Sequence, residues 1–294
     1  MEISKIVVGI DFSEESEIAA KYAVKIARYT GASVVLVHAG LVLDKQYGPS
    51  RSAAAREWEQ MVDAQLAGDR DQLEVLRERL AAQHQDISHM VIDGFADTGL
   101  CEAAKELGAD LVITGTHGRT GIKRLFMGSV AERAVRLCET NVMVARPGAE
   151  GSGPFRRILV PTDFSIHADK ALQLAMILAA PDGQIDVFHA WNTPPELALE
   201  WTGPVLHELA TNAREAGERL LAKHHRDRLT LGFDTTRARP IDGVLERLQG
   251  GDYDLVVMGS HGRRGLRRFL LGSVAELTVR HAPCSVLVAH HQED

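Results

Sequence analysis

Two patterns of apolar and polar residues follow one another along this chain. Short apolar runs such as Ile6–Ile10 and Ser33–His38 are typical of strands buried on both faces. Between them, Ser16–Tyr29 carries its apolar residues at the three- and four-residue spacing of an amphipathic helix, which Gly31 would end. Alternating strands and helices predict a parallel sheet with helices on both faces.

The predicted elements follow one another in the same order in both halves of the chain. In the first half they are strand Ile6–Ile10, helix Ser16–Tyr29, strand Ser33–His38, a helix within residues 52–83, strand Ser88–Ile92, helix Leu100–Leu107, strand Asp110–Thr114, helix Ser129–Leu137 and strand Asn141–Ala145. The second half ends with strand Ser285–Ala289. The predicted fold class is therefore α/β, with two similar doubly wound domains, each a five-stranded parallel sheet flanked by helices.

An internal repeat supports this division. The segment GTHGRTGIKRLFMGSVAERAVR beginning at Gly115 returns as GSHGRRGLRRFLLGSVAELTVR beginning at Gly259, identical at most positions. The copies meet at a stretch rich in Gly and Pro that is typical of a linker. We predict domains at residues 1–146 and 155–294, joined by a linker at residues 147–154.

Composition narrows the protein class. The 294 residues are 45% hydrophobic and 25% charged, which excludes a disordered chain, a collagen and a coiled coil. A net charge of −7 and no basic-aromatic stripe argue against a nucleic-acid partner. No apolar run approaches a membrane span, and the start of the chain has no signal-peptide pattern, so we expect a cytoplasmic protein without a membrane partner.

The chain has 3 cysteines. Their odd number and the lack of a CxxC spacing exclude a disulfide framework and argue against a zinc site. We expect Cys101, Cys138 and Cys284 to be small buried apolar residues in a reducing compartment.

In doubly wound sheets, ligands bind beyond the carboxyl ends of the strands where strand order reverses, here between strands one and four. After strand four, each copy has a G-x2-G-x9-G-S loop, formed by Gly115, Gly118, Gly128 and Ser129 and by Gly259, Gly262, Gly272 and Ser273. Glycine amides beside a helix start form a phosphate site, to which Arg119 and Arg263 would add charge. Ser129…Glu132 and Ser273…Glu276 fit capping boxes. A loop that needs glycine only for tight turns is the alternative.

Strand one ends at Asp11 in the first copy and Asp163 in the second, where a carboxylate would accept hydrogen bonds from a ribose or cap the following helix. His38, His189, His117 and His261 recur at matching positions, and we expect them to make structural hydrogen bonds. They lack metal-ligand spacing, and neither a GxSxG elbow, a GxxxxGK[ST] loop nor a GxGxxG fingerprint is present. We therefore assign no catalytic and no metal-binding residue.

These motifs resemble the universal stress protein family, in its tandem two-domain, ATP-binding form. The resemblance rests on GIDFS at Gly9 and PTDFS at Pro161, the strand-two His-Ala pairs, and the two glycine loops. It implies a fold similar to that of adenine nucleotide alpha hydrolases and an adenine nucleotide, ATP with or without Mg, at each switch point. It also implies pairing of the last strands, Asn141–Ala145 with Ser285–Ala289, into an intramolecular pseudo-dimer.

The resemblance also assigns residues. By position, Asp11 and Asp163 would meet ribose and adenine, Ala39 and Ala190 adenine, the loop glycines and serines the ribose and phosphates, and Ser13 and Ser165 the phosphates or a Mg²⁺ ion. The predicted nucleotide sites are completed by His117, Arg119 and Val130 in the first copy, and by Thr162, His261, Arg263 and Val274 in the second.

Two departures from the family pattern stand in the first copy. It has Gly9-Ile10 where the family more often has Pro-Thr or Pro-Val, and Asp93–Gly99 replaces the second copy's Thr235–Pro240. Because the latter stretch borders the pocket, we expect unequal affinities at the two sites.

The function predicted is an ATP-binding stress-response sensor or regulator. The alternatives are a slow ATPase or nucleotide-transferring enzyme, and a nucleotide-independent adaptor for a protein partner. A homodimer and an unidentified protein partner stay open.

Overall fold

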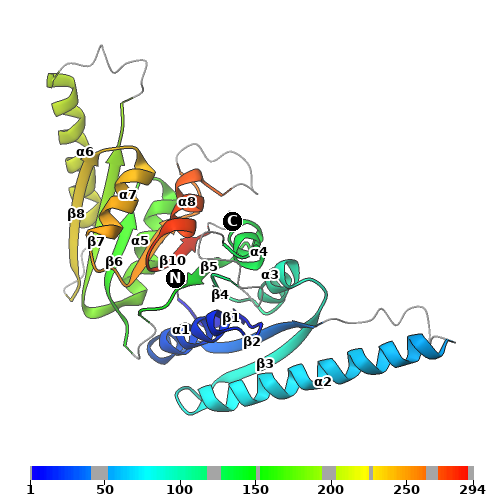
Figure 1. The fold of residues 1–294 in the computed structure, drawn as a ribbon. Coiled ribbons are helices and arrows are strands. Elements are labelled where there is room, and N and C mark those ends of the chain that lie inside the picture. Colours follow the sequence, from blue (N-terminus) through cyan, green and yellow to red (C-terminus); the bar gives the residue numbers. More distant parts are fainter. Residues whose placement is uncertain are drawn as a thin grey trace. The chain divides into compact units, whose positions relative to one another are not determined.

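The structure is a computed structural model that describes residues 2–40, 52–117, 127–149, 153–193, 203–224, 228–262 and 271–290. It divides into two compact units, Ile3–Thr140, and Asn141–Asp294 together with Met1–Glu2 (Figure 1). Within the described residues, no helix combines the length and apolarity that a membrane crossing requires.

The sheet of the first unit is parallel and has the strand order β3-β2-β1-β4. Its strands are β1 (Lys5–Gly9), β2 (Ser33–Gly40), β3 (Ile87–Asp93) and β4 (Leu111–Gly115). The chain passes from β1 to β2 to β3 in one direction and then returns to the other side of β1. The order therefore reverses between β1 and β4, where a ligand crevice is expected.

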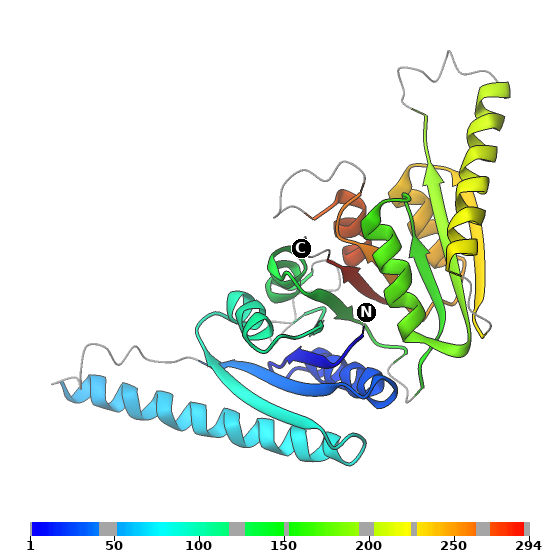
Figure 2. The same ribbon diagram turned by 180° about the vertical axis from the view of Figure 1, so that it is seen from behind.

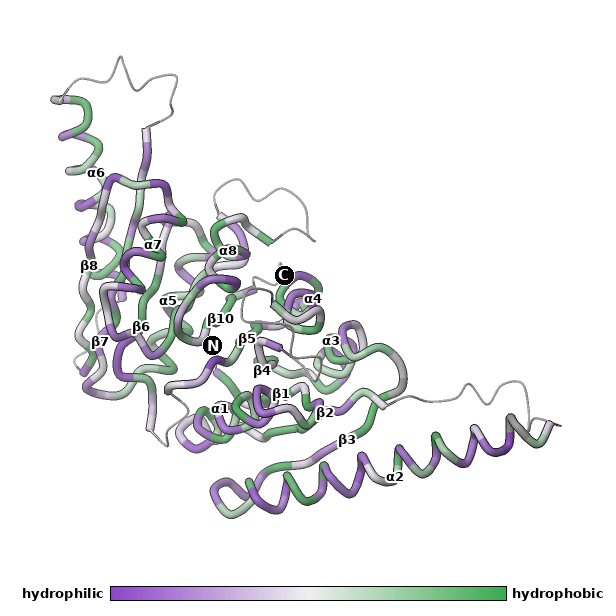
Figure 3. The backbone as a smooth tube through the Cα atoms, viewed as in Figure 1, coloured by the Kyte–Doolittle hydropathy of each residue, from purple (hydrophilic) through white to green (hydrophobic). Residues whose placement is uncertain are grey.

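Helices cover both faces of this sheet. They are α1 (Glu14–Thr30), α2 (Ala53–Ala81), α3 (Ala96–Glu106) and α4 (Ser129–Leu137). The pair α1 and α2 lies on one face and the pair α3 and α4 on the other, and apolar and polar residues alternate along α2 (Figure 3). Helix α1 begins at the cap Ser13, whose side chain accepts a hydrogen bond from the Ser16 amide. It ends at Gly31, which takes the left-handed conformation with φ 77°.

The second unit repeats this plan and adds two strands. Its strands are β5 (Asn141–Ala145), β6 (Phe155–Pro161), β7 (Ala179–Trp191), β8 (Thr230–Arg237), β9 (Leu255–Gly259) and β10 (Ser285–Ala289), in the order β5-β10-β9-β6-β7-β8. The added strands, β10 and β5, lie beside β9. All neighbours are parallel except β5 and β10, which pair antiparallel through Val144 and Val286.

The second unit also has two layers of helices. They are α5 (Ile166–Leu178), α6 (Gly203–Lys223), α7 (Pro240–Gln249) and α8 (Ser273–His281). Helices α5 and α6 form the layer seen in front in Figure 2, and α7 and α8 pack on the opposite face. The predicted α/β fold class with two repeated, doubly wound domains is confirmed, with element ends that differ from the predictions by a few residues.

The central strands supply the core. Ile6, Val7 and Val8 of β1 and Val286 and Leu287 of β10 have no exposed surface, as the continuous apolar runs predicted. Burying a side chain of this size contributes about 1.5–3 kcal/mol.

The prediction for the cysteines was wrong for two of them. Cys101 of α3 and Cys138, the residue after α4, form a disulfide with a Cα–Cα distance of 4.9 Å. The residues are 37 positions apart, and only the packing of α3 on α4 brings them together. Cys284 is a free thiol whose pKa is raised to about 12 by burial.

Candidate functional site

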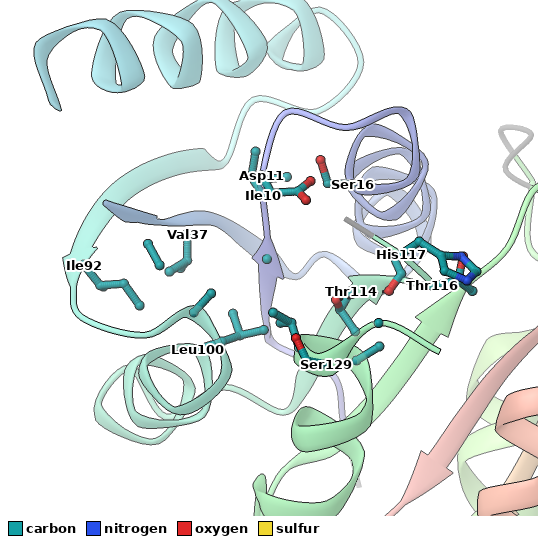
Figure 4. Close-up of a pocket in the computed structure, with 17 residues that line it drawn as sticks. Ile10, Asp11, Ser16, Val37, Ile92, Leu100, Thr114, Thr116, His117 and Ser129 are labelled. Carbon is teal, nitrogen blue, oxygen red and sulfur yellow. Dashed lines mark hydrogen bonds between the residues drawn. The ribbon is translucent and has the colours of Figure 1, made fainter. Parts of the chain in front are cut away.

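Each unit has a pocket at the predicted switch point. The first lies at the carboxyl ends of β1, β2 and β4 and the start of α4 (Figure 4). The second lies at the same ends of β6, β7 and β9 and the start of α8. Asp11 and Asp163, Ala39 and Ala190, and Gly115 and Gly259 occupy matching places in the two pockets.

A tight turn after the first strand of each unit holds the pocket aspartate, Asp11 or Asp163, in place. The Asp11 carboxylate accepts hydrogen bonds from the amide and the hydroxyl of Ser13, and Asp163 accepts one from the Ser165 amide at 3.0 Å. The residue between the aspartate and the serine of each turn, Phe12 or Phe164, adopts a left-handed conformation, with φ 63° and 62° respectively. Such a conformation strains a bulky residue, so its presence in both copies indicates that the turn geometry is needed.

The strand-two histidines hold the backbone of these turns. The His38 Nδ1–H donates to the Ile10 carbonyl at 2.7 Å, and the His189 Nδ1–H donates to the Thr162 carbonyl at the same distance. The ring of His38 packs against that of Phe12, with 4.7 Å between the ring centroids. These two histidines position the turn, in agreement with the structural role expected for them.

The N-terminus of α4 lies at the first pocket, and its N-cap residue is a glycine, which has no side chain to cap the helix. Gly128 is the N-cap of α4 and Gly272 that of α8, both in extended conformation, and no side chain of the described residues caps either helix. The predicted capping boxes were therefore wrong, because Ser129 and Ser273 are the first helical residues and not the caps. The first-turn amides have no intrahelical partner, and together with the helix dipole they present hydrogen-bond donors and a partial positive charge at the pocket wall.

Two glycines are needed where the backbone passes close to another group. A Cβ on Gly115 would lie 2.8 Å from the Glu15 backbone, so β4 can approach the start of α1 only with glycine there. A Cβ on Gly262 would lie 2.6 Å from the Asp163 Oδ2 atom. Glycine at 262 thus leaves room for the Asp163 carboxylate in the pocket.

The loop histidines His117 and His261 line the pockets after β4 and β9. His117 Nδ1 lies 3.1 Å from the Thr116 hydroxyl, and His261 Nδ1 lies 3.1 Å from the Ser260 hydroxyl. The buried Nε2 atoms of both histidines have no hydrogen-bond partner within the described residues. In Figure 4, His117 and Thr116 stand at the opposite end of the site from Ile92.

The two pockets differ in size. The cavity volume is about 140 Å³ in the first unit and about 510 Å³ in the second. Ile92 and Leu100 line the first pocket, where Leu100 Cδ2 lies 3.0 Å from the position that a Cβ on Gly9 would take. In the second pocket the smaller Val244 stands in the place of Leu100.

Most predicted site residues that the structure describes line a pocket. In the first they are Asp11, Ala39, Gly115, His117, Gly128, Ser129 and Val130, and in the second Thr162, Asp163, Ala190, Gly259, His261, Gly262, Gly272, Ser273 and Val274. Ser13 and Ser165 instead cap α1 and α5, and Ser165 lines a separate cavity between α5 and α6. Gly118, Arg119 and Arg263 lie outside the described residues.

Sequence reasoning missed the wall contributed by the helix after strand three. Ala96 and Leu100 of α3 line the first pocket, and Pro240 and Val244 of α7 line the second. The signal was available, because both pairs have the four-residue spacing of one helix face and occupy matching places in the repeat. Within the described ranges, no group of three or more metal-ligating side chains gathers.

The family model named "Universal stress protein family" matches residues 2–146 and again residues 154–290. The chain belongs to the universal stress protein family. The predicted family and its tandem two-domain arrangement are confirmed.

Relatives of this family match the whole chain. A universal stress protein of Mycolicibacterium smegmatis is 27% identical over 303 residues, which cover 96% of each chain. One of Mycobacterium bovis is 24% identical over 291 residues, which cover 97% of this chain and 96% of the relative. The crystal structure of a universal stress protein from Archaeoglobus fulgidus has a TM-score of 0.70 at 18% identity, and covers 99% of this chain and 100% of that one. This likeness shows that the fold is shared.

Proposed function

We propose that this universal stress protein binds an adenine nucleotide, ATP with or without Mg, in each of its two pockets, and acts as a stress-response sensor or regulator. One observation carries the proposal. Among the described residues, both units place a helix N-terminus without a side-chain cap, a strand end with glycine and one aspartate around the same crevice.

The start of α4 or α8 suits the phosphates. The first-turn amides of Ser129 and Val130, or of Ser273 and Val274, supply donors that a phosphate accepts without a competing side-chain cap. A buried imidazole Nε2 atom on His117 or His261, which has no hydrogen-bond partner among the described residues, adds a polar group at the same end. Mg²⁺, if present, would arrive with the phosphates, since no group of three or more metal-ligating side chains gathers within the described residues.

The other end of each pocket suits a nucleoside. The Asp11 or Asp163 carboxylate, which lines the pocket, would accept hydrogen bonds from ribose hydroxyls. Apolar side chains form the remaining wall, from Val37 and Leu100 in the first pocket and Phe188 and Val244 in the second. An apolar slot with a few convergent polar groups is typical of small-molecule sites.

We favour a sensor over an enzyme because each described pocket wall holds one carboxylate. Phosphoryl transfer normally needs several charged groups and metal ligands around the γ-phosphate. We further propose that the protein works in the cytoplasm, and that its two copies form a pseudo-dimer. The antiparallel pairing of β5 with β10 supports the latter.

Calorimetric titration of the nucleotide-free, full-length chain with Mg-ATP tests the proposal. We expect two binding events in the wild type, with the event of the first or second pocket weakened about 10- to 100-fold by Asp11→Asn or Asp163→Asn respectively. Asparagine keeps the Oδ1 acceptor of the tight turn but replaces the outer acceptor by a donor.

Asp182→Asn is the matched control, because Asp182 is an exposed partner of Arg156 and lines neither pocket. This control variant should bind two equivalents of Mg-ATP, as the wild type does. Unchanged binding by the Asp11→Asn/Asp163→Asn double variant would refute the assignment of the sites. Phosphate release that saturates with ATP in the same preparations would favour a slow ATPase.

A further inference from the structure

The disulfide joins the two helices that wall the first pocket. Cys101 lies in the middle of α3 and Cys138 directly follows α4. Helix α3 contributes Ala96 and Leu100 to the pocket, and the first turn of α4 contributes Ser129. The separation of these helices is therefore set by a covalent bond beside the crevice.

Leu100 connects this bond to the size of the pocket. It precedes Cys101 in α3, is 2% exposed, and lies against the glycine that ends β1. The Cα atoms of Cys101 and Cys138 lie 4.9 Å apart, so the disulfide fixes the middle of α3 against the end of α4 at this point. Leu100, the neighbour of Cys101, lines the crevice on the same helix and is fixed with it.

The second copy shows the same architecture without the bond. By alignment of the repeats, Leu245 and Ala282 stand where the first copy has Cys101 and Cys138. Its pocket volume, about 510 Å³, lies within the roughly 300–1,000 Å³ typical of small-molecule sites, whereas the 140 Å³ of the first pocket lies below it.

We propose that the Cys101–Cys138 pair is a thiol–disulfide switch that sets the nucleotide affinity of the first pocket, an inference that rests on the proposed nucleotide function. The disulfide holds the pocket narrow and its affinity low. In the dithiol, α3 moves away from α4, Leu100 withdraws, and the pocket admits the nucleoside. The second pocket, which has no such pair, binds in both states.

The redox step balances with a small-molecule disulfide as the oxidant. The two thiols lose two electrons and two protons in forming the S–S bond, and oxidised glutathione takes them up to become two molecules of glutathione. Cys101 is partly exposed and Cys138 is 3% exposed, so exchange begins at the Cys101 sulfur. A disulfide in a cytoplasmic protein is typically of this reversible, sensing kind.

The test compares oxidised and reduced full-length protein. One sample is treated with oxidised glutathione and one with a phosphine reductant, the thiol state is verified by alkylation and mass spectrometry, and both are titrated with Mg-ATP. In the Asp163→Asn background, which isolates the first pocket, we expect reduction to tighten binding about 10-fold or more. The second pocket, measured in the Asp11→Asn background, should not change with redox state.

Two variants sharpen the comparison. Cys101→Leu/Cys138→Ala carries the residues of the second copy, and its first pocket should bind like the reduced protein under both conditions. Cys284→Ser removes the remaining cysteine and should keep the full redox response. If the double variant fails to fold, the wild-type comparison alone decides.

Equal or tighter binding to the oxidised first pocket, with normal binding at the second, would overturn the switch and leave the nucleotide function standing. Resistance of the native disulfide to the reductant would also overturn it. Absence of Mg-ATP binding at both pockets in both redox states would instead refute the proposed function itself.

Discussion

At the scale of single residues, the most informative feature is a pair of left-handed phenylalanines. Phe12 and Phe164 occupy the same place in each copy, directly after the pocket aspartate. In both, the ring packs on the strand-two histidine, with 4.7 Å between the ring centroids. The aromatic contact offsets a conformation that costs a non-glycine residue about 1–2 kcal/mol.

This strain can be measured by comparing two truncations of one side chain. Phe164→Gly and Phe164→Ala both lose the ring, but only glycine adopts φ 62° without a steric penalty. We expect the glycine variant to be more stable than the alanine variant by about 1 kcal/mol, the reverse of their usual order, in urea unfolding. Greater stability of the alanine variant would show that the turn relaxes once the ring is removed.

At the scale of elements, helix α6 packs on its sheet through a glycine. A Cβ on Gly217 would lie 2.3 Å from the Phe233 ring of β8, which also contacts Phe164 at 6.1 Å between centroids. The absence of a side chain therefore sets the distance between helix and strand. In α2 of the first unit, a Cβ on Gly68 would meet nothing within 4 Å.

The two helical glycines should respond to alanine in opposite directions. Gly217→Ala should destabilise the protein by about 1–3 kcal/mol, because the Phe233 ring must move. Gly68→Ala should stabilise it by about 0.5–1 kcal/mol through helix propensity alone. Thermal unfolding of both variants beside the wild type gives the signs, and a gain in stability for Gly217→Ala would contradict the packing described.

At the scale of the whole molecule, the end of the first copy completes the second unit. Strand β5 extends the second sheet, and the Arg146 guanidinium beyond it donates to the Val279 carbonyl at 2.7 Å and the Arg280 carbonyl at 3.3 Å. These carbonyls lie in the last turn of α8, where cations stabilise a helix. Burial lowers the pKa of Arg146.

Loss of this contact should weaken the second unit. We expect Arg146→Ala to destabilise the protein by about 1–3 kcal/mol, because two carbonyls at a helix end lose their donor. Arg156→Ala removes an exposed ion pair with Asp182 and should cost less than about 1 kcal/mol. Equal losses of unfolding free energy for Arg146→Ala and Arg156→Ala in chemical denaturation would show that the Arg146 contact with the end of α8 adds no specific stability.

Local pattern determined much of this protein in advance. The apolar runs of β1 and β10 predicted the strands because a strand buried on both faces needs apolar residues throughout. The repeated glycine loops and the aspartates after strand one predicted the crevice because the carboxyl ends of parallel strands meet at one edge. The family could be identified for the same reason, since these short motifs carry its resemblance.

Only the tertiary structure decided what depends on distance between elements. Cys101 and Cys138 became partners because α3 packs on α4, which no spacing between the two residues indicates. Gly128 is the N-cap of α4 because its backbone is extended where the chain enters the helix. Ser129 is therefore the first helical residue. The reach of Leu100 toward Gly9 set the size of the first pocket, since helix–sheet distance is a property of packing and is not encoded in any single segment.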